Sequence, residues 1–187
     1  VRMWWNFVAT DRERIAHAAK PWEHGDFVST VITQNVDDLH ERAGSIDVLH
    51  LHGSLQQPRC AICGQTHQMP AGIPQEPEGG RRLSPPTCDK CGGSIRPGVV
   101  WFGEDLPAGA LQLAQRQAQA CDLFFTIGTS GLVYPAAHIP VLAKQAGTQV
   151  VQINPMVTQL DATCSWSLRG AAGEILPSIV HAAFPPA

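Results

Sequence analysis

Two Cys-x-x-Cys pairs are the clearest chemical pattern in the sequence: Cys60 with Cys63, and Cys88 with Cys91. Two such pairs supply four thiolates for a tetrahedral Zn²⁺ site with no open position. Disulfides or free thiols are the alternative. In a chain of 187 residues for which we expect no secretion signal, however, paired cysteines favour metal. The pattern therefore predicts a structural zinc site.

Polar or small residues follow three apolar runs, and a histidine follows a fourth. In open parallel sheets, ligands bind outside the carboxyl ends of the strands. We therefore expect these residues to share one rim that accepts a nucleotide. Histidine titrates near neutral pH and can accept a proton there, although a lone histidine before glycine is more often a packing or surface residue. The residues concerned are Gln34–Asp37, His52, Gly128–Ser130 and Asn154.

The elements that must position these residues alternate between strand and helix, which predicts an α/β fold with a parallel sheet. Short β-branched or aromatic runs predict the strands, and apolar spacing with flanking Pro or Gly predicts the helices. The expected strands cover 27–33, 48–53, 123–127 and 149–153. The expected helices cover 12–19, 108–120, 136–145 and 174–183.

Residues 60–95 differ in composition from the rest of the chain. They are rich in proline and glycine, which exclude a long helix or strand there. Metal binding can order such a segment without a large apolar core. We therefore predict a Rossmann-like domain formed by 1–58 and 96–187, with a small zinc-binding module, 59–95, inserted in it.

The overall composition narrows the function classes. Hydrophobic residues make up 44% of the chain and the net charge is −3, which argues against a strongly basic nucleic-acid surface. The sequence contains no run of 18 apolar residues, so no membrane-spanning helix is predicted. We therefore expect a cytoplasmic protein with neither membrane nor nucleic acid as a partner.

Several ordered motifs resemble the sirtuin family, over about residues 28–180. The match is closest to the bacterial and mitochondrial branch known for removing acidic acyl groups. The segment Thr33–Gly44 resembles the sirtuin signature, and Leu51–Ser54 resembles the segment with the catalytic histidine. The cysteine pairs follow in the family's order. The remaining matching segments are Arg96–Glu104, Gly128–Ser130, Val133–Ala136 and Ile153–Asn154.

The resemblance implies an NAD-dependent protein-lysine deacylase that releases nicotinamide and O-acyl-ADP-ribose. It implies that His52 is the base that takes a proton from a ribose hydroxyl. An acylated lysine peptide would add as a strand between Gly103–Glu104 and Leu132–Tyr134. The implied NAD-binding residues are Gln34, Asn35, Val36, Asp37, Gly128, Thr129, Ser130, Asn154 and Ala172. The implied substrate-binding residues are Val100, Phe102, Gly103 and Glu104, with Val100 and Phe102 forming an apolar tunnel.

Two departures from the family qualify this expectation. The sequence has no counterpart of the glycine-rich loop with which sirtuins open, so we expect a sheet that is incomplete at its N-terminus. A truncated or degenerate zinc protein that binds NAD or acylated peptides without turnover is the alternative, and a zinc-ribbon nucleic-acid binder is a third hypothesis. The acidic-acyl branch also carries a Tyr-x-x-Arg pair, where this chain has Phe7, Thr10 and Arg12. We therefore favour deacetylation, with desuccinylation or demalonylation left open.

Overall fold

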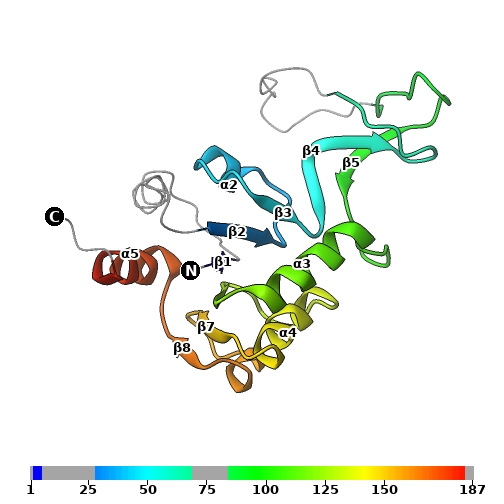
Figure 1. Ribbon diagram of the computed structural model, residues 1–187. Coiled ribbons are helices and arrows are strands. Elements are labelled where there is room, and N and C mark those ends of the chain that lie inside the picture. Colours follow the sequence, from blue (N-terminus) through cyan, green and yellow to red (C-terminus); the bar gives the residue numbers. More distant parts are fainter. Residues whose placement is uncertain (1, 6–27, 69–83, 184–187) are drawn as a thin grey trace.

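A six-stranded parallel sheet forms the centre of the computed structural model, which describes residues 2–5, 28–68 and 84–183 (Figure 1). Its strands lie in the order β3-β2-β1-β6-β7-β8, and every neighbouring pair is parallel. The strands are β1 Arg2–Trp5, β2 Val28–Thr33, β3 Val48–His50, β6 Leu123–Ile127, β7 Gln149–Ile153 and β8 Trp166–Leu168.

The direction of strand addition reverses between β1 and β6. From β1 the chain adds β2 and β3 on one side, and from β6 it adds β7 and β8 on the other. This is the strand order of Rossmann folds, in which a dinucleotide binds at the carboxyl ends of the strands beside the reversal. The predicted α/β Rossmann-like class is therefore confirmed.

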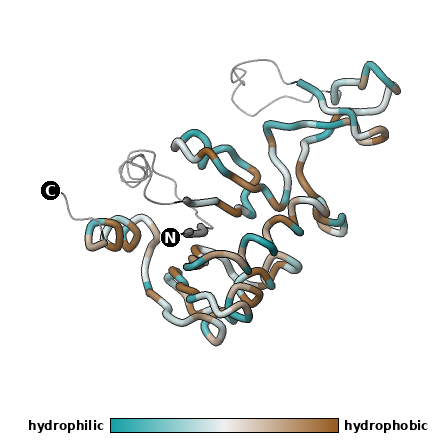
Figure 2. The backbone as a smooth tube through the Cα atoms, viewed as in Figure 1, coloured by the Kyte–Doolittle hydropathy of each residue, from teal (hydrophilic) through white to brown (hydrophobic). Residues whose placement is uncertain are grey.

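Helices cover both faces of the sheet. The helices α3 Ala108–Ala120 and α4 Ile139–Gln145 pack with Phe124 and Val150, whereas α5 Ala172–Ala183 packs with Phe125 and Val151. Successive strand residues point to opposite faces, which is why neighbours along β6 and β7 enter different cores. Figure 2 shows hydrophobic segments along α4 and α5. The shorter helices are α2 Leu39–Arg42, η2 Ala136–His138 and η3 Gln159–Ala162.

A second, two-stranded sheet leaves the first beside the end of β3 (Figure 1). It pairs β4 Gly53–Cys60 with β5 Ile95–Val99 in antiparallel register. The two backbones are very close at its base, since a Cβ on Gly98 would lie 1.8 Å from the carbonyl oxygen of Gln57. Gly53 has a φ of +75°, and a Cβ there would lie 2.1 Å from the carbonyl oxygen of Gly98. Only glycine fits at these two positions.

Most predicted elements are confirmed, with differences at their ends. The helix predicted over 108–120 and the strands predicted over 123–127 and 149–153 match α3, β6 and β7. The strand predicted over 48–53 ends at His50, because the chain turns at Leu51 and His52 before β4 begins. The helix predicted over 136–145 begins as the 3₁₀ helix η2, and Pro140 lies in the first turn of α4.

Four strands, β1, β4, β5 and β8, were not predicted from the sequence. The helix predicted over 12–19 lies outside the described residues. Of the apolar run 99–102, only Val99 belongs to a strand, and the rest forms a loop. Among residues 2–5, 28–68 and 84–183, no helix combines the length and hydrophobicity that crossing a membrane requires.

Candidate functional site

Three of the predicted polar segments meet at the carboxyl edge of the large sheet. Gln34, which follows β2, donates from Nε2 to Oγ1 of Thr129, which follows β6, over 3.2 Å. Asn154, at the end of β7, donates from Nδ2 to the carbonyl oxygen of Thr129 over 2.9 Å. Residues from three separate strand ends therefore belong to one hydrogen-bonded rim.

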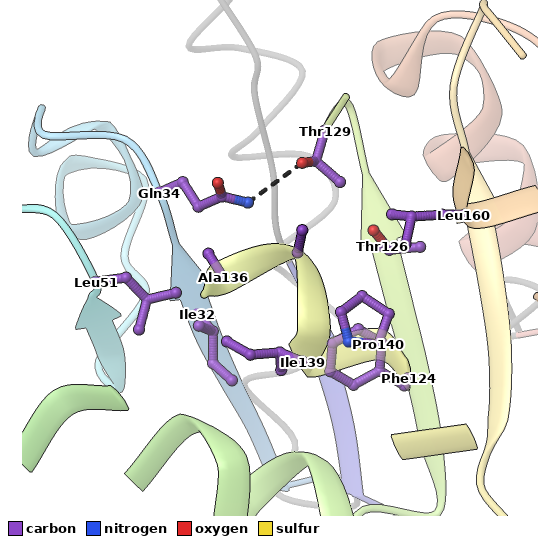
Figure 3. A pocket seen from close by; sticks show the side chains of 11 residues that line it. Ile32, Gln34, Leu51, Phe124, Thr126, Thr129, Ala136, Ile139, Pro140 and Leu160 are labelled. Carbon is purple, nitrogen blue, oxygen red and sulfur yellow. Dashed lines mark hydrogen bonds between the residues drawn. The ribbon is translucent and has the colours of Figure 1, made fainter. Parts of the chain in front are cut away.

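A pocket with mainly apolar walls lies below this rim (Figure 3). The bond between Gln34 and Thr129 crosses its upper end in this view. Ile32 and Leu51 line one side, and Phe124 and Pro140 line the other. The pocket encloses only about 20 Å³, so it forms an apolar floor beneath the polar rim rather than a chamber for a ligand. Pro140 and Leu160, which also lines the pocket, were not predicted as site residues.

His52 lies partly exposed in the turn between β3 and β4, with Nδ1 2.9 Å from the carbonyl oxygen of Gln34. A carbonyl only accepts hydrogen bonds, so this geometry requires the proton on Nδ1. In the neutral ring, Nε2 then carries the lone pair and can accept a proton. The protein thereby selects the tautomer that a general base needs.

The segment Gln34–Asp37 is held mainly through its backbone. The N–H of Asn35 donates to Oγ1 of Thr33 over 3.0 Å, and the carbonyl oxygen of Val36 accepts from the N–H of Leu55 over 2.8 Å. Asp37 accepts at Oδ1 from the N–H of Leu39 over 3.1 Å, at the start of α2. These contacts fix the loop while the side chains of Gln34 and Asn35 are partly exposed.

The loop after β6 depends on small residues. Gly128 has a φ of +65°, and its N–H donates to the carbonyl oxygen of Ile153 over 3.0 Å. The hydroxyl of Ser130 accepts from the N–H of Leu132 over 3.3 Å. A Cβ on Gly131 would lie 2.7 Å from Cγ of Leu160, so this loop packs tightly on η3. Gly131 was not predicted as a site residue, although it extends the Gly128–Ser130 motif by one residue.

Two further predicted cofactor residues differ in their surroundings. Asn154 is 7% exposed, and its Oδ1 accepts from the N–H of Met156 over 3.0 Å, so both ends of the amide are engaged. Ala172 begins α5 and packs against the core beneath that helix. No described hydrogen bond connects Ala172 with the rim, and its role stays a prediction.

The predicted substrate segment is tied to His52 and closed by an ion pair. The N–H of Val100, which is partly buried, donates to the carbonyl oxygen of His52 over 2.8 Å. Both carboxylate oxygens of Glu104 accept from the guanidinium of Arg96. That guanidinium also stacks on the ring of Trp101, 3.5 Å from its centroid. Phe102 projects from this loop fully exposed.

Charge and hydrogen bonds stabilise the ionised form of Glu104. The Arg96 guanidinium is the main cause, followed by the N–H of Trp101, which donates to Oε2 over 3.0 Å. Together they lower the pKa of Glu104 to about 2. The carboxylate therefore holds the loop closed, and Gly103 at the turn has a φ of +88°. The part that Arg96 plays here was not predicted from the sequence.

The four predicted metal ligands converge at the far end of the small sheet. Their sulfur atoms all lie within 4.8 Å of one another. The Sγ atoms of Cys60 and Cys91 are 3.4 Å apart, and those of Cys63 and Cys88 are 3.7 Å apart. Zn–S bonds of about 2.3 Å in a tetrahedron give S···S separations of roughly 3.8 Å, so the cluster fits Zn²⁺.

The surroundings of Cys60 also suit a thiolate ligand. Its sulfur accepts from the N–H of Ile62 over 3.4 Å. The N–H groups of Cys63 and Ile62 are the main reasons why the pKa of Cys60 falls to about 6. All four cysteines are free of disulfides, as the metal interpretation requires. Cys60 and Cys88 are buried with Ile95, which makes a small core beside the cluster.

Comparison with known proteins identifies relatives of this chain. The model of the Sir2 family matches residues 2–135. An NAD-dependent protein deacylase of Methylococcus capsulatus is 56% identical over 153 residues, which make up 82% of this chain and 60% of that protein. The chain therefore spans about three fifths of the length of this relative.

Solved structures share both the fold and part of the sequence. A Sir2 homologue in complex with NAD has a TM-score of 0.78 and 43% identity, over 90% of this chain and 63% of that one. A Sir2 structure with a p53 peptide and NAD⁺ has a TM-score of 0.75 and 31% identity, over 90% of this chain and 69% of that one.

Proposed function

The chain belongs to the Sir2 family, and we propose that it removes acyl groups from protein lysine side chains with NAD as co-substrate, releasing nicotinamide and O-acyl-ADP-ribose. One observation carries the proposal: Gln34, whose side chain bonds to Thr129 in the rim, also accepts the bond from His52 at its carbonyl oxygen. A single residue thus joins the rim that suits a nucleotide to a histidine in the tautomer that suits a base.

The rim residues would bind NAD according to their chemistry. The amides of Gln34 and Asn35 and the carboxylate of Asp37 suit a carboxamide and ribose hydroxyls. Gly128, Thr129 and Ser130 leave room for close backbone approach to the phosphates. On the same proposal, Val36 lines the nicotinamide side, Asn154 binds the adenosine ribose and Ala172 lies near adenine. NAD, when bound, supplies the ADP-ribosyl group that takes over the acyl group.

His52 would act through its Nε2 atom. The Nδ1–H bond to the carbonyl oxygen of Gln34 keeps the lone pair on Nε2, which takes a proton from a ribose hydroxyl. The same carbonyl then faces the positive charge that forms on the ring and stabilises it. The ring and the NAD-binding segment therefore keep a fixed mutual position during the proton transfer.

The acylated lysine peptide would bind as an added strand between Gly103–Glu104 and Leu132–Tyr134. Leu132, Val133 and Tyr134 are all exposed, which leaves that side open to a partner. Val100 and Phe102 would line the tunnel for the lysine stem. We propose deacetylation as the main activity, with removal of succinyl or malonyl groups as the open variant. Phe7, Thr10 and Arg12, which bear on that choice, lie outside the described residues.

Cys60, Cys63, Cys88 and Cys91 would hold a structural Zn²⁺. The ion would brace the outer end of the β4–β5 sheet, whose inner end carries His52 and the loop after Val99. We propose a zinc-binding module at 59–95 on that basis, with an NAD-binding domain formed by 1–58 and 96–187.

The test is nicotinamide release, measured by chromatography with the full chain, NAD and an acetyl-lysine peptide. Release is expected only when both substrates are present. His52→Ala is expected to lower it by about 10²-fold or more. His181→Ala, which changes an exposed histidine on α5, is expected to leave it unchanged. NAD binding by calorimetry without any release would overturn the catalytic proposal and support a binding protein instead.

A further inference from the structure

His50 and His52, two positions apart in the chain, hold the same segment. Each contacts one of two consecutive backbone carbonyl oxygens in it. Nδ1 of His52 lies 2.9 Å from the carbonyl oxygen of Gln34, and Nδ1 of His50 lies 3.1 Å from that of Asn35. His50 ends β3 and is opposite Thr33 in the register with β2. The side chain of His50 is 14% exposed, so it is mostly enclosed behind the loop rather than directed to solvent.

The second nitrogen of His50 is also engaged. Nε2 lies 2.7 Å from Oε1 of Glu41 in α2. A carbonyl oxygen and a carboxylate both accept hydrogen bonds, so both nitrogens of His50 can be satisfied only if both carry protons. Burial alone would raise the pKa of Glu41, yet the bond from His50 and its charge bring it below the usual value. The two acceptors that face the ring therefore fit an imidazole that carries a proton on each nitrogen.

The contacts of His50 close the segment between Asn35 and Glu41 into a clamped loop. Asn35 begins this segment and Glu41 ends it, while Asp37 lies between them and accepts from the start of α2. The other charged groups on α2 are Asp38 and Arg42, which pair with each other, and His40, which is buried and acts on Glu41. His50 contacts the backbone carbonyl of Asn35 and the carboxylate of Glu41. Neither group is one of the side chains that form the rim. The influence of His50 on the rim therefore passes through the backbone of Asn35.

We propose that His50, as an imidazolium paired with Glu41, is a positioning residue that fixes the NAD-contacting segment 34–37 relative to His52. This inference rests on the proposed function, since it concerns how the same site is held. Hydrogen bonds that involve an ionised group are stronger than neutral ones, so loss of the charge weakens both ends of the clamp. Weaker clamping raises the cost of ordering the loop around NAD and leaves the peptide side unaffected.

Steady-state kinetics on the full chain test this assignment. His50→Gln and Glu41→Gln are each expected to raise the KM for NAD by about tenfold, with the KM for the acetyl peptide unchanged. Glu174→Gln, which changes an exposed carboxylate on α5, is the matched control and is expected to behave like the unaltered chain. Thermal melting monitors folding. A folded His50→Gln variant with an unchanged KM for NAD, or with equal losses for both substrates, overturns the proposal.

Nitrogen-15 NMR of the imidazoles gives a readout that does not depend on turnover. With both contacts in place, both nitrogens of His50 are expected to show the shifts of protonated nitrogen, and Glu41→Gln is expected to convert one of them to the unprotonated type. A neutral His50 in the unaltered chain overturns the inference while leaving deacylation intact. A cationic His50 in a chain that releases no nicotinamide has the opposite meaning: the clamp stands and the proposed function fails.

Discussion

The N–H of Val100 donates a hydrogen bond to the carbonyl oxygen of His52 over 2.8 Å. This bond joins the residue proposed as the base to the segment proposed to hold acyl-lysine, and it uses backbone atoms on both sides. The side chain of residue 100 can therefore change without loss of the connection. The position of the peptide loop depends instead on Arg96 and Glu104, whose ion pair fixes the backbone before and after Val100.

Loss of the ion pair between Arg96 and Glu104 is expected to weaken peptide binding selectively. Arg96→Met removes the bonds to Glu104 and to the carbonyl oxygen of Val99. Because the pair is partly exposed, we expect the KM for the acetyl peptide to rise by about three- to fivefold, with the KM for NAD unchanged. Arg116→Met, at an exposed position of α3, is the control. Equal effects of the two substitutions would contradict the role given to Arg96.

The same ion pair predicts how the loop responds to acid. The pKa of Glu104 is lowered from its usual 4.5 to about 2, so its ionised form is favoured in the folded chain. The stabilisation is therefore present above about pH 4.5 and is lost as the pH falls through about 2. Carbon-13 NMR of the Glu104 carboxyl is expected to show titration near pH 2. In Arg96→Met the midpoint should move upward, and a midpoint that stays in place would rule out the guanidinium as the main cause.

A Cβ at position 131 is expected to destabilise the loop after β6. Gly131 has a φ of +70°, and its Cβ would lie 2.7 Å from Cγ of Leu160. Gly131→Ala is expected to lower the free energy of unfolding by about 1–3 kcal/mol in urea titrations and to weaken NAD binding.

Gly109→Ala is the matched control for that substitution. Gly109 lies in the first turn of α3, and nothing lies within 4 Å of the position of its Cβ. We expect it to be neutral or to stabilise the chain by up to about 1 kcal/mol. If Gly131→Ala proved as harmless as this control, the tight packing between the loop and η3 would be refuted.

Removal of the metal is expected to affect the small sheet before the large one. The purified chain should contain about one equivalent of zinc, and Cys88→Ser should lose it. Cys121→Ser and Cys164→Ser are controls, because these two cysteines lie outside the cluster. After chelation, hydrogen exchange should accelerate in β4 and β5 while β6 and β7 stay protected. Zinc bound as tightly by Cys88→Ser as by the controls would exclude the four-cysteine site.

The parts of the fold that could be predicted are those encoded by local patterns. The runs that form β6 and β7 are apolar and β-branched or aromatic, and each ends in a small or polar residue. Since the ends of parallel strands meet at one edge, the meeting of Gln34, Thr129 and Asn154 followed from the pattern. The cysteine cluster followed from the spacing of the two Cys-x-x-Cys pairs together with the expected absence of a secretion signal.

The features that could not be predicted depend on contacts between distant residues. β4 contains Gln56, Gln57 and Pro58, which do not favour a strand, and it forms because its backbone pairs with β5. β1 has four residues, too few for a periodic pattern. The bond between His50 and Glu41 joins β3 to α2, and its meaning rests on which atoms face each other. Composition and spacing carry no such information.

The six strands of the large sheet pair with one another without any help from β4 or β5. β4, β5 and the four-cysteine cluster thus form an insertion in the chain between strands β1–β3 and strands β6–β8 of the large sheet. Additions and deletions at its outer end would leave the pairing of the sheet untouched. We expect this insertion to tolerate changes of length, while the two glycines at its base, Gly53 and Gly98, admit no side chain because a Cβ there would clash with backbone oxygens.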